Sequence, residues 1–303
     1  GESMTNSLET DNMRGLVWRL AIPSMLAQFV SVLYSIVDRM YIGNIPEIGE
    51  MALAGVGVCG PIVTLVSSAA FLVGIGGAPL VSIRMGQKNY RSARAILANC
   101  FLMLAVIAVA LTVVSLLLKE HLLMWFGASE NSFVYADQYI TIYLLGTFFA
   151  LMSTGMNQFI ICQGFAKTGM LSVVLGAVCN IALDPLFIFV FGMGVRGAAV
   201  ATVLSQMVSC LFVLVFLFGK RPVIPITFGN YHWFIMKRVM SVGFSPFLII
   251  AFDNILIISL NSVIQKYGGA GRGDMLLTCA TILQSFMLMV TMPLGGITTG
   301  TQT

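Results

Sequence analysis

Four ionisable side chains inside long apolar segments stand out, because a charge is costly to bury there: Asp38, Arg39, Asp184 and Asp253. Asp38 belongs to the segment 15–42, and Asp184 belongs to the segment 169–191. Ionisable groups at membrane depth are rare and commonly mark ion or proton pathways. The structural alternative is a buried ion pair. For Arg39, next to Asp38, the alternative is a long side chain that reaches toward the end of its helix.

Asp38 and Asp184 each belong to a stripe of polar residues, because residues four apart share one face of a helix. The stripes are Gln28, Ser31, Ser35 and Asp38, with Tyr34 one turn before the acid; Ser172, Gly176, Asn180 and Asp184; and Thr202, Ser205 and Ser209, beside Gln206. Carboxylate, amide and hydroxyl oxygens suit a hard cation, whereas a desolvated carboxylate can instead hold a proton. We therefore expect the stripes to converge on an interior, water-accessible cavity whose carboxylate, amide and hydroxyl oxygens are candidates to hold a cation or a proton.

Further polar residues are candidates for lining a substrate cavity. They are Gln28, Tyr34 and Ser35 in the first segment; Tyr139, Tyr143, Asn157 and Gln158 in the fourth; and Asp253, Asn254, Asn261 and Gln265 in the seventh. Hydrogen bonding between helices explains such amides equally well. Tyrosines of membrane helices are often packing or interface residues.

The elements that carry these residues are long apolar segments. Hydrophobic residues make up 58% of the chain and charged residues 9%, far below the roughly 25% charged residues of soluble domains. Lipid must therefore cover most of the surface. About 20 apolar residues are needed to cross a bilayer, and eight segments qualify: 15–42, 52–83, 94–118, 136–162, 169–191, 197–219, 238–264 and 275–300. We expect an all-α polytopic membrane helix bundle.

Alternate loops differ in charge. The segments 84–94, 162–169 and 219–238 carry Lys and Arg but no acid. The positive-inside rule places these loops in the cytoplasm, together with the N-terminus, and makes the chain a multi-pass protein of the inner or plasma membrane. The net charge of +4 then reflects topology, and we expect no nucleic-acid partner.

The sequence lacks the usual signatures of enzymes. His121 and His232 are the only histidines, and they have no metal-ligand spacing. Neither a nucleophile elbow nor a phosphate-binding loop occurs. We expect no enzyme activity and no cofactor.

A faint internal repeat relates the first and seventh segments. Pro23 and Asp38 have the same spacing as Pro246 and Asn261. Repeats of this kind are typical of transporters built from two related halves. If the repeat is real, a second half begins near residue 230 and is incomplete in this chain.

Several motifs together resemble the multidrug and toxic compound extrusion (MATE) family of cation-coupled exporters. They are LAIPSMLAQFVSVLYSIVDRMYIG in the first segment, VGIGGAPLVSIRMGQKNYRSAR after the second, CQGFAKTGM followed by NIALDPLFIF and GVRGAAVATVLSQ, and TMPLGGITTGTQT near the end. The N-x-x-x-D-P pattern followed by G-A-A-x-A-T is the most specific part. The resemblance covers nearly the whole chain.

The resemblance implies twelve helices in two six-helix lobes, of which this chain would end in the eighth. The domains would be an N-terminal tail (1–13), a six-helix N-lobe (14–219), a cytoplasmic linker (220–237) and two helices of a C-lobe (238–303). In the DinF-like branch, the N-lobe site for Na⁺ or H⁺ would be Asp38, Asn180, Asp184 and Thr202, and Asp253 resembles a C-lobe acid.

The expected function is export of organic cations or amphipathic compounds by a monomer in antiport with Na⁺ or H⁺. Three alternatives remain open. A flippase for lipid-linked precursors would be expected to have a basic cavity, an intramembrane enzyme would need a nucleophile or metal site, and a chain of this length could be a non-functional fragment.

Overall fold

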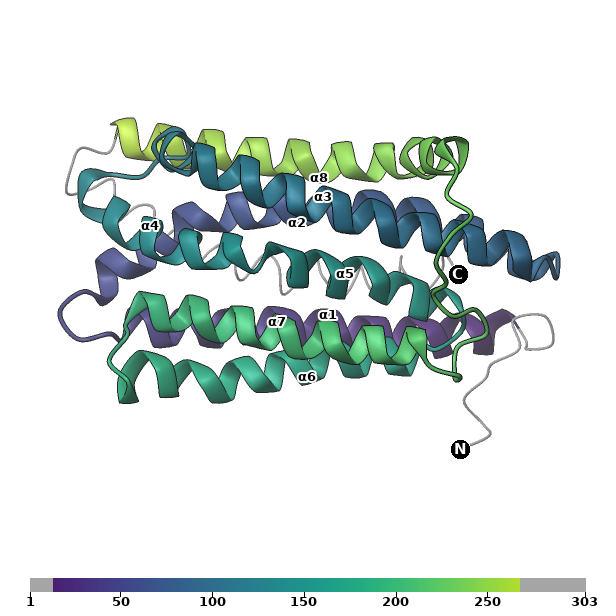
Figure 1. Cartoon of the computed structure of the whole chain (residues 1–303). Coiled ribbons are helices and arrows are strands. Elements are labelled where there is room, and N and C mark those ends of the chain that lie inside the picture. The colour runs from purple at the N-terminus through teal and green to yellow at the C-terminus, as the bar shows by residue number, and fades with distance from the viewer. Residues whose placement is uncertain (1–12, 268–303) are drawn as a thin grey trace.

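The structure of the protein is a computed structural model that describes residues 13–267, and the described chain is a bundle of long helices. Most of them run side by side along one axis (Figure 1). In chain order they are α1 (Met13–Gly43), α2 (Gly49–Gly86), α3 (Tyr90–Trp125), α4 (Glu130–Leu145), α5 (Thr147–Cys162), α6 (Ala166–Pro185), η2 (Leu186–Val190), α7 (Val195–Phe218) and α8 (Trp233–Tyr267). These elements contain seven of the eight expected spans, and the eighth, 275–300, lies outside the described residues.

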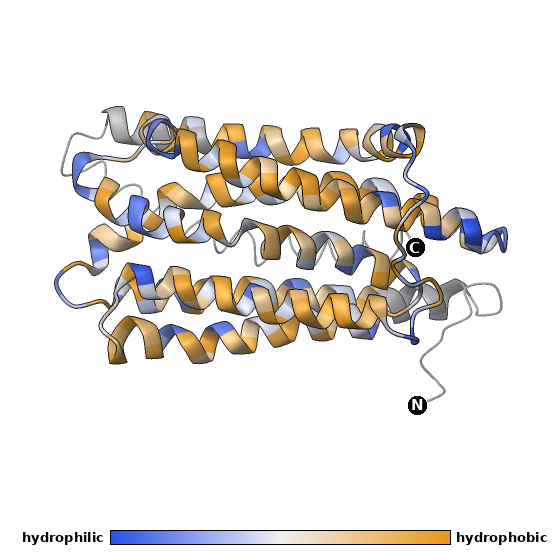
Figure 2. Cartoon of the chain, viewed as in Figure 1, coloured by the Kyte–Doolittle hydropathy of each residue, from blue (hydrophilic) through white to orange (hydrophobic). Residues whose placement is uncertain are grey.

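The helices have the length and composition of membrane spans. Among the described residues, six helices are long and apolar enough to cross a bilayer, and the bent pair of α4 and α5 makes a seventh. Apolar residues run along the helices, whereas hydrophilic residues gather at their ends (Figure 2). The protein is therefore a polytopic helical membrane protein, as the composition indicates.

The fourth span differs from the single helix expected over 136–162. It consists of α4 and α5, which meet at Gly146 with a bend of 58°. A Cβ atom at Gly146 would lie 2.7 Å from Val203 Cγ2 of α7, so glycine permits this close approach. The Thr147 hydroxyl donates to the Leu144 carbonyl at 2.7 Å, which satisfies one backbone acceptor at the break.

The fifth span also changes its winding. The α-helix α6 ends at Pro185 and continues as the π-helical turn η2. Proline has no backbone N–H to donate and disturbs the regular hydrogen-bond ladder. The irregular turn follows Asp184 directly, and π-helical turns are frequent at functional sites.

The last described helix begins earlier than expected. The sequence analysis placed the seventh span at 238–264 and a linker at 220–237, but α8 already begins at Trp233. The connection from α7 is therefore residues 219–232. Helix α8 lies beside α2 and α3 (Figure 1).

Two clusters of buried apolar side chains fill opposite ends of the bundle. One joins α2, α3, α5 and α7 near the connection 219–232 and includes Phe159 and Val239. The other joins the end of α1, the start of α2, α4 and the start of α7, and it includes Tyr139 and Tyr143. The polar residues of the candidate site adjoin the second cluster.

Candidate functional site

The two interior acids face each other across a helix pair. Asp38 lies on α1 and Asp184 at the end of α6, and these helices pack against each other. Their side chains are 7% and 0% exposed, and the carboxyl groups are within hydrogen-bonding reach. A hydrogen bond between carboxyl groups requires a proton on one of them. Two ionised carboxylates at this separation would repel unless a cation lay between them.

One acceptor of this pair lacks a partner. Asp38 Oδ1 is buried and makes no hydrogen bond with any residue of the described range 13–267. A buried polar atom left unpaired is costly and calls for an explanation. Occupation by a cation or by a hydrogen-bond donor would satisfy it.

Asn180 connects Asp184 to α7. It lies one turn before Asp184, and it is 1% exposed. With its amide nitrogen turned toward the carboxylate, Asn180 donates to Asp184 Oδ2 at 2.7 Å. In the opposite orientation the same nitrogen donates to Thr202 Oγ1 at 3.3 Å. The four expected ion-site residues, Asp38, Asn180, Asp184 and Thr202, are therefore all buried along the interface of α1, α6 and α7.

Two tyrosines of α4 line the same region. Tyr139 and Tyr143 are one turn apart, with ring centroids separated by 6.2 Å and an angle of 11° between the ring planes. The Tyr139 hydroxyl contacts Thr202, and the Tyr143 hydroxyl accepts from Gln206 Nε2 at 3.5 Å. The sequence analysis assigned these tyrosines to a substrate path. Only the tertiary contact of α4 with α7 shows that they adjoin the ion-site residues.

Arg39 places a positive charge near the acids. The residue follows Asp38 and is half-buried, and its Nη2 atom lies 3.7 Å from where a Cβ of Gly60 on α2 would be. A neighbouring cation favours the ionised form of a carboxyl group. Arg39 is thus part of the electrostatic surroundings of Asp38.

The other half of the polar stripes joins helices together. Ser209 Oγ donates to the Ser172 carbonyl at 2.9 Å, and Ser172 Oγ donates to Asn157 Oδ1 at 3.1 Å. Asn157 Nδ2 in turn reaches the Gly169 carbonyl at 3.4 Å. These bonds connect α5, α6 and α7 in the buried interior. They explain Asn157, a substrate-cavity candidate, by helix packing.

The remaining cavity candidates lie on two helices, α1 and α8. Gln28, Tyr34 and Ser35 are half-buried on α1, and Ser35 Oγ donates to the Ser31 carbonyl at 3.1 Å. On α8, Asp253 is exposed, whereas Asn254 is buried and donates to the Ile250 carbonyl at 2.8 Å. The helix α8 and the pair α1 and α6 are on opposite sides of the bundle (Figure 1). The side chain of Asn261 lies outside the described residues.

The candidate ion site offers oxygen atoms as ligands. Within residues 13–267 no group of three or more His, Cys, Asp and Glu side chains is placed to hold a metal ion. Two carboxylates, one amide and one hydroxyl form a donor set suited to a singly charged hard cation or to a proton.

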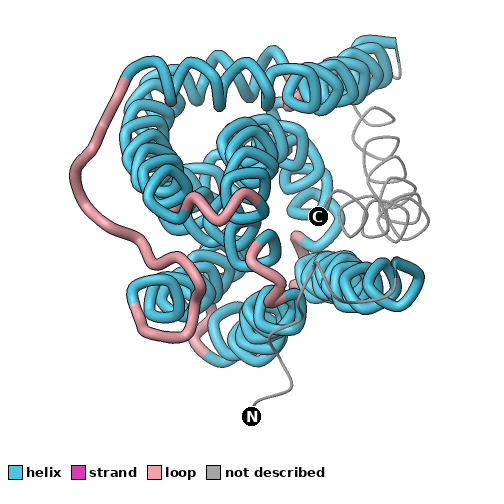
Figure 3. Tube along the Cα trace, turned by 90° about the vertical axis from the view of Figure 1, so that its right-hand side faces the viewer, coloured by secondary structure: helices cyan, strands magenta, loops and turns pink. Residues whose placement is uncertain are grey.

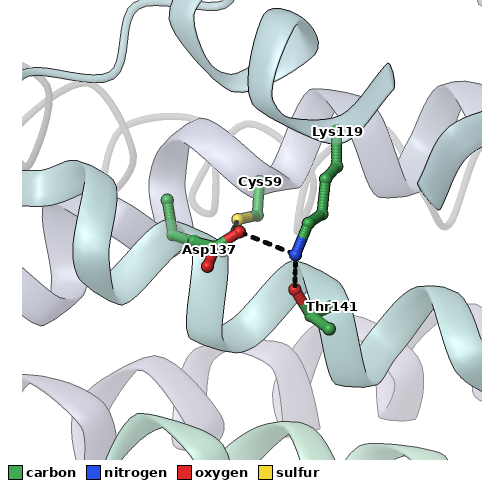
Figure 4. Close-up of polar contacts among 5 residues, drawn as sticks. Cys59, Lys119, Asp137 and Thr141 are labelled. Carbon is green, nitrogen blue, oxygen red and sulfur yellow. Dashed lines mark hydrogen bonds and ion pairs between the residues drawn. The ribbon is translucent and has the colours of Figure 1, made fainter. Parts of the chain in front are cut away.

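A second polar cluster connects α2, α3 and α4 (Figure 4). Lys119 Nζ forms an ion pair with Asp137 Oδ1 at 3.1 Å and donates to Thr141 Oγ1 at 2.7 Å. The buried Cys59 thiol donates to the Ala136 carbonyl at 3.2 Å. Because Lys119 and Asp137 pair with each other and remain partly solvent-accessible, this cluster joins the helices and needs no ligand.

Comparisons with known proteins agree with this architecture. A sequence model of the family described as MatE matches residues 23–186, more than half of the chain. The multidrug export protein MepA of Staphylococcus saprophyticus is 26% identical over 253 residues, covering 82% of this chain and 55% of that protein. The probable multidrug resistance protein YpnP of Bacillus subtilis is 26% identical over 251 residues, with the same coverage.

A solved structure supports the same conclusion. The structure of the MATE multidrug transporter DinF-BH superimposes with a TM-score of 0.90 at 31% identity, covering 99% of this chain and 66% of that chain. The chain spans about half the length of the curated relatives it matches. These relatives are transporters and not enzymes. The family match over residues 23–186 and the shared helical architecture show that this multi-pass membrane protein belongs to the MatE family of transporters.

Proposed function

We propose that the complete protein is a secondary-active exporter of organic cations or other amphipathic compounds, driven by antiport with Na⁺ or H⁺. The observation that carries this proposal is the buried pair of Asp38 and Asp184 between α1 and α6. The electrostatic energy of a buried carboxyl pair differs strongly between the ion-bound and the ion-free state. Such a difference is what coupling to an ion gradient requires. The relatives MepA and YpnP are named for multidrug export and resistance.

Na⁺ and H⁺ would use the same residues in different ways. Na⁺ would bind the carboxylates of Asp38 and Asp184, the amide oxygen of Asn180 and the hydroxyl of Thr202. A proton would instead be shared between the two carboxyl groups, with Asn180 donating to Asp184 Oδ2. In both cases the ion brings α1 and α6 together, because one acid comes from each helix.

Helix α1 would connect ion binding at Asp38 to the shape of the substrate cavity. It contains Pro23, which removes one backbone hydrogen bond and weakens the helix locally. Binding at Asp38 would change how α1 packs on α6 and thereby the substrate cavity, for which Gln28, Tyr34 and Ser35 are candidates. Asp253, Asn254 and Asn261 are further candidates. Alternating access would then rock two lobes about this cavity.

The same proposal includes the arrangement in the cell. Residues 14–219 would form one lobe and α8 would begin the second, in a monomeric protein of the inner or plasma membrane. The basic loops and the N-terminus would lie in the cytoplasm. A flippase for lipid-linked precursors is the alternative in the transport class, but the acids of the described interior favour a cationic substrate.

The test is efflux from vesicles that contain the full-length protein, under separately imposed Na⁺ and proton gradients. We expect one gradient to drive efflux of a fluorescent organic cation, and Asp38→Asn and Asp184→Asn to abolish it without loss of membrane insertion. Glu50→Gln, which alters an exposed acid at the start of α2, is the matched control and should transport normally. Unchanged efflux by the Asp38→Asn protein would refute the role.

A further inference from the structure

The connection between α7 and α8 is attached to the helix bundle by buried amides. Gln163, 5% exposed, accepts from the Ile224 backbone N–H at 2.9 Å and donates to the Ile224 carbonyl at 3.1 Å. Ile224 and Ile226 are themselves buried in the apolar cluster at this end. Residues 219–232, which we call the strap, are therefore packed against the bundle.

A second amide holds the end of the strap. Asn99 of α3 is fully buried, donates to the Asn230 carbonyl at 3.0 Å and accepts from the His232 N–H at 2.9 Å. His232 directly precedes α8. The start of α8 is thereby tied to α3.

The first turns of α8 lie across the bundle rather than along it. Viewed down the bundle axis, α8 leaves the strap, runs across the end of the bundle and only then turns to follow the other helices (Figure 3). The same turns are seen nearly end-on at the right of Figure 1. Val239 and Gly243 are buried, and a Cβ at Gly243 would overlap the Leu72 carbonyl of α2. One face of these turns is thus fixed to the bundle.

The opposite face is aromatic and basic. Trp233 and Phe234 are 70% and 69% exposed, and Lys237 and Arg238 next to them are also exposed. The strap adds Phe228, 72% exposed, and the neighbouring exposed residues are Lys220, Arg221 and Tyr231. No acid occurs between residues 219 and 238.

This combination fits the headgroup layer of a bilayer. Amphipathic helices that lie in the membrane plane combine apolar anchors with Lys and Arg. Tryptophan and tyrosine prefer the interface, and basic side chains there attract anionic lipids. We propose that the strap and the first turns of α8, residues 219–242, form a docking surface for the headgroups of anionic phospholipids.

Lipid binding at this surface would act on the position of α8. Asn99 of α3 and Gln163 at the end of α5 attach the strap to the bundle, and Gly243 of α8 contacts α2. A headgroup bound to the strap would therefore hold the start of α8 against α2 and α3. The surface would then sense membrane composition independently of the Asp38 site.

Fluorescence quenching by brominated lipids tests the proposal in the full-length protein. Residues 1–303 contain three tryptophans, so the double variant Trp18→Phe/Trp125→Phe, with any tryptophan outside these residues also replaced by phenylalanine, reports on Trp233 alone. In nanodiscs we expect brominated phosphatidylglycerol to quench Trp233 with a relative affinity about threefold or more above that of brominated phosphatidylcholine. In the same background, Lys220→Gln/Arg221→Gln/Lys237→Gln/Arg238→Gln should remove the preference and leave quenching by phosphatidylcholine unchanged.

A matched control uses the other end of the bundle. Trp125 at the end of α3 is 64% exposed, and a protein in which it is the sole tryptophan should show no preference. Equal quenching of Trp233 by the two lipids would overturn the proposal. A preference that persists after the four glutamine substitutions would also overturn it.

Discussion

Asp38 on α1 and Asp184 on α6 bring their carboxyl groups within hydrogen-bonding reach in the interior of the bundle, with Asp184 fully buried. One oxygen of Asp38 lacks a partner among the described residues. Two ionised carboxylates at this separation would repel each other, and a proton or a cation between them would relieve the repulsion. Under the proposed function, ion binding therefore changes the stability of the folded protein, which can be measured without transport.

The first prediction concerns the stability of the acid pair. A ligand that binds the folded state stabilises it by about 2.7 kcal/mol at a concentration of 100 Kd. We expect the melting temperature of the wild-type protein in detergent to depend on Na⁺ concentration or on pH. Asp38→Asn should abolish that dependence. Its own melting temperature should be equal or higher, because a neutral amide is less costly to bury than a carboxylate.

The measurement is thermal unfolding followed by a thiol-reactive dye, since Cys59, Cys100, Cys162 and Cys210 are buried in the folded protein, whereas the partly exposed Cys179 is replaced by alanine in every variant. Glu50→Gln is again the control and should behave as the wild type. An Asp38→Asn protein that keeps the full ion dependence would contradict a site at this pair.

The second prediction concerns Asn180, whose amide reaches both Asp184 and Thr202. Asn180→Ala removes one oxygen ligand and one hydrogen-bond donor to a charged group, an interaction worth roughly 1.5–3 kcal/mol. For a Na⁺ site, the Na⁺ concentration at half-maximal efflux should therefore rise about tenfold or more. For a proton site the proton concentration at half-maximal efflux should instead fall, because losing a donor to the carboxylate favours its protonated form. Ser205→Ala is the comparison, because within residues 13–267 Ser205 Oγ bonds only the Ala201 carbonyl of its own helix, at 2.7 Å. Similar half-maximal concentrations for the two variants would argue against a direct role of Asn180.

The third prediction concerns the crossing of α2 and α8. A Cβ at Gly76 would overlap the Val239 carbonyl of α8. Gly76→Ala should force the helices apart and cost about 1–3 kcal/mol of stability. Gly86→Ala, at the exposed end of the same helix, meets nothing within 4 Å and should be neutral. The comparison is again thermal unfolding, and equal melting temperatures for the two variants would show that the contact is not restrictive.

The fourth prediction concerns the strap. Gln163→Ala leaves the N–H and carbonyl of buried Ile224 without their partners, at a cost of about 1–3 kcal/mol. Local opening of residues 219–232 should become about tenfold more frequent. Limited trypsin digestion after Lys220 reports this opening, because Pro222 blocks cleavage after Arg221. Gln87→Ala, an exposed position after α2, should be cut at the wild-type rate, and a strap that is not cut faster in Gln163→Ala would not be held by this amide.

Much of the fold could be predicted because a bilayer imposes a minimum length of apolar sequence on each span. The segment 197–219 corresponds closely to α7 (Val195–Phe218), and the segment 94–118 lies inside the longer α3 (Tyr90–Trp125). The break at Gly146 could not be predicted, since glycine is tolerated inside membrane helices. What decides it is the close approach of Val203 from a distant part of the chain.

The polar stripes show the same division. Helical periodicity alone placed Asn180 and Asp184 on one face of α6. The apolar sequence around Asp38 alone indicated that its charge is costly to bury. Periodicity could not tell that Ser172 and Ser209 bond to neighbouring helices whereas Asp38 and Asp184 face each other. That distinction depends on which helices pack together and at what rotation. The sequence by itself therefore determined which helices exist and which of their faces are polar, because those depend on local spacing and on the solvent. Only the tertiary structure decided which polar faces meet, because that depends on contacts between residues far apart in the chain.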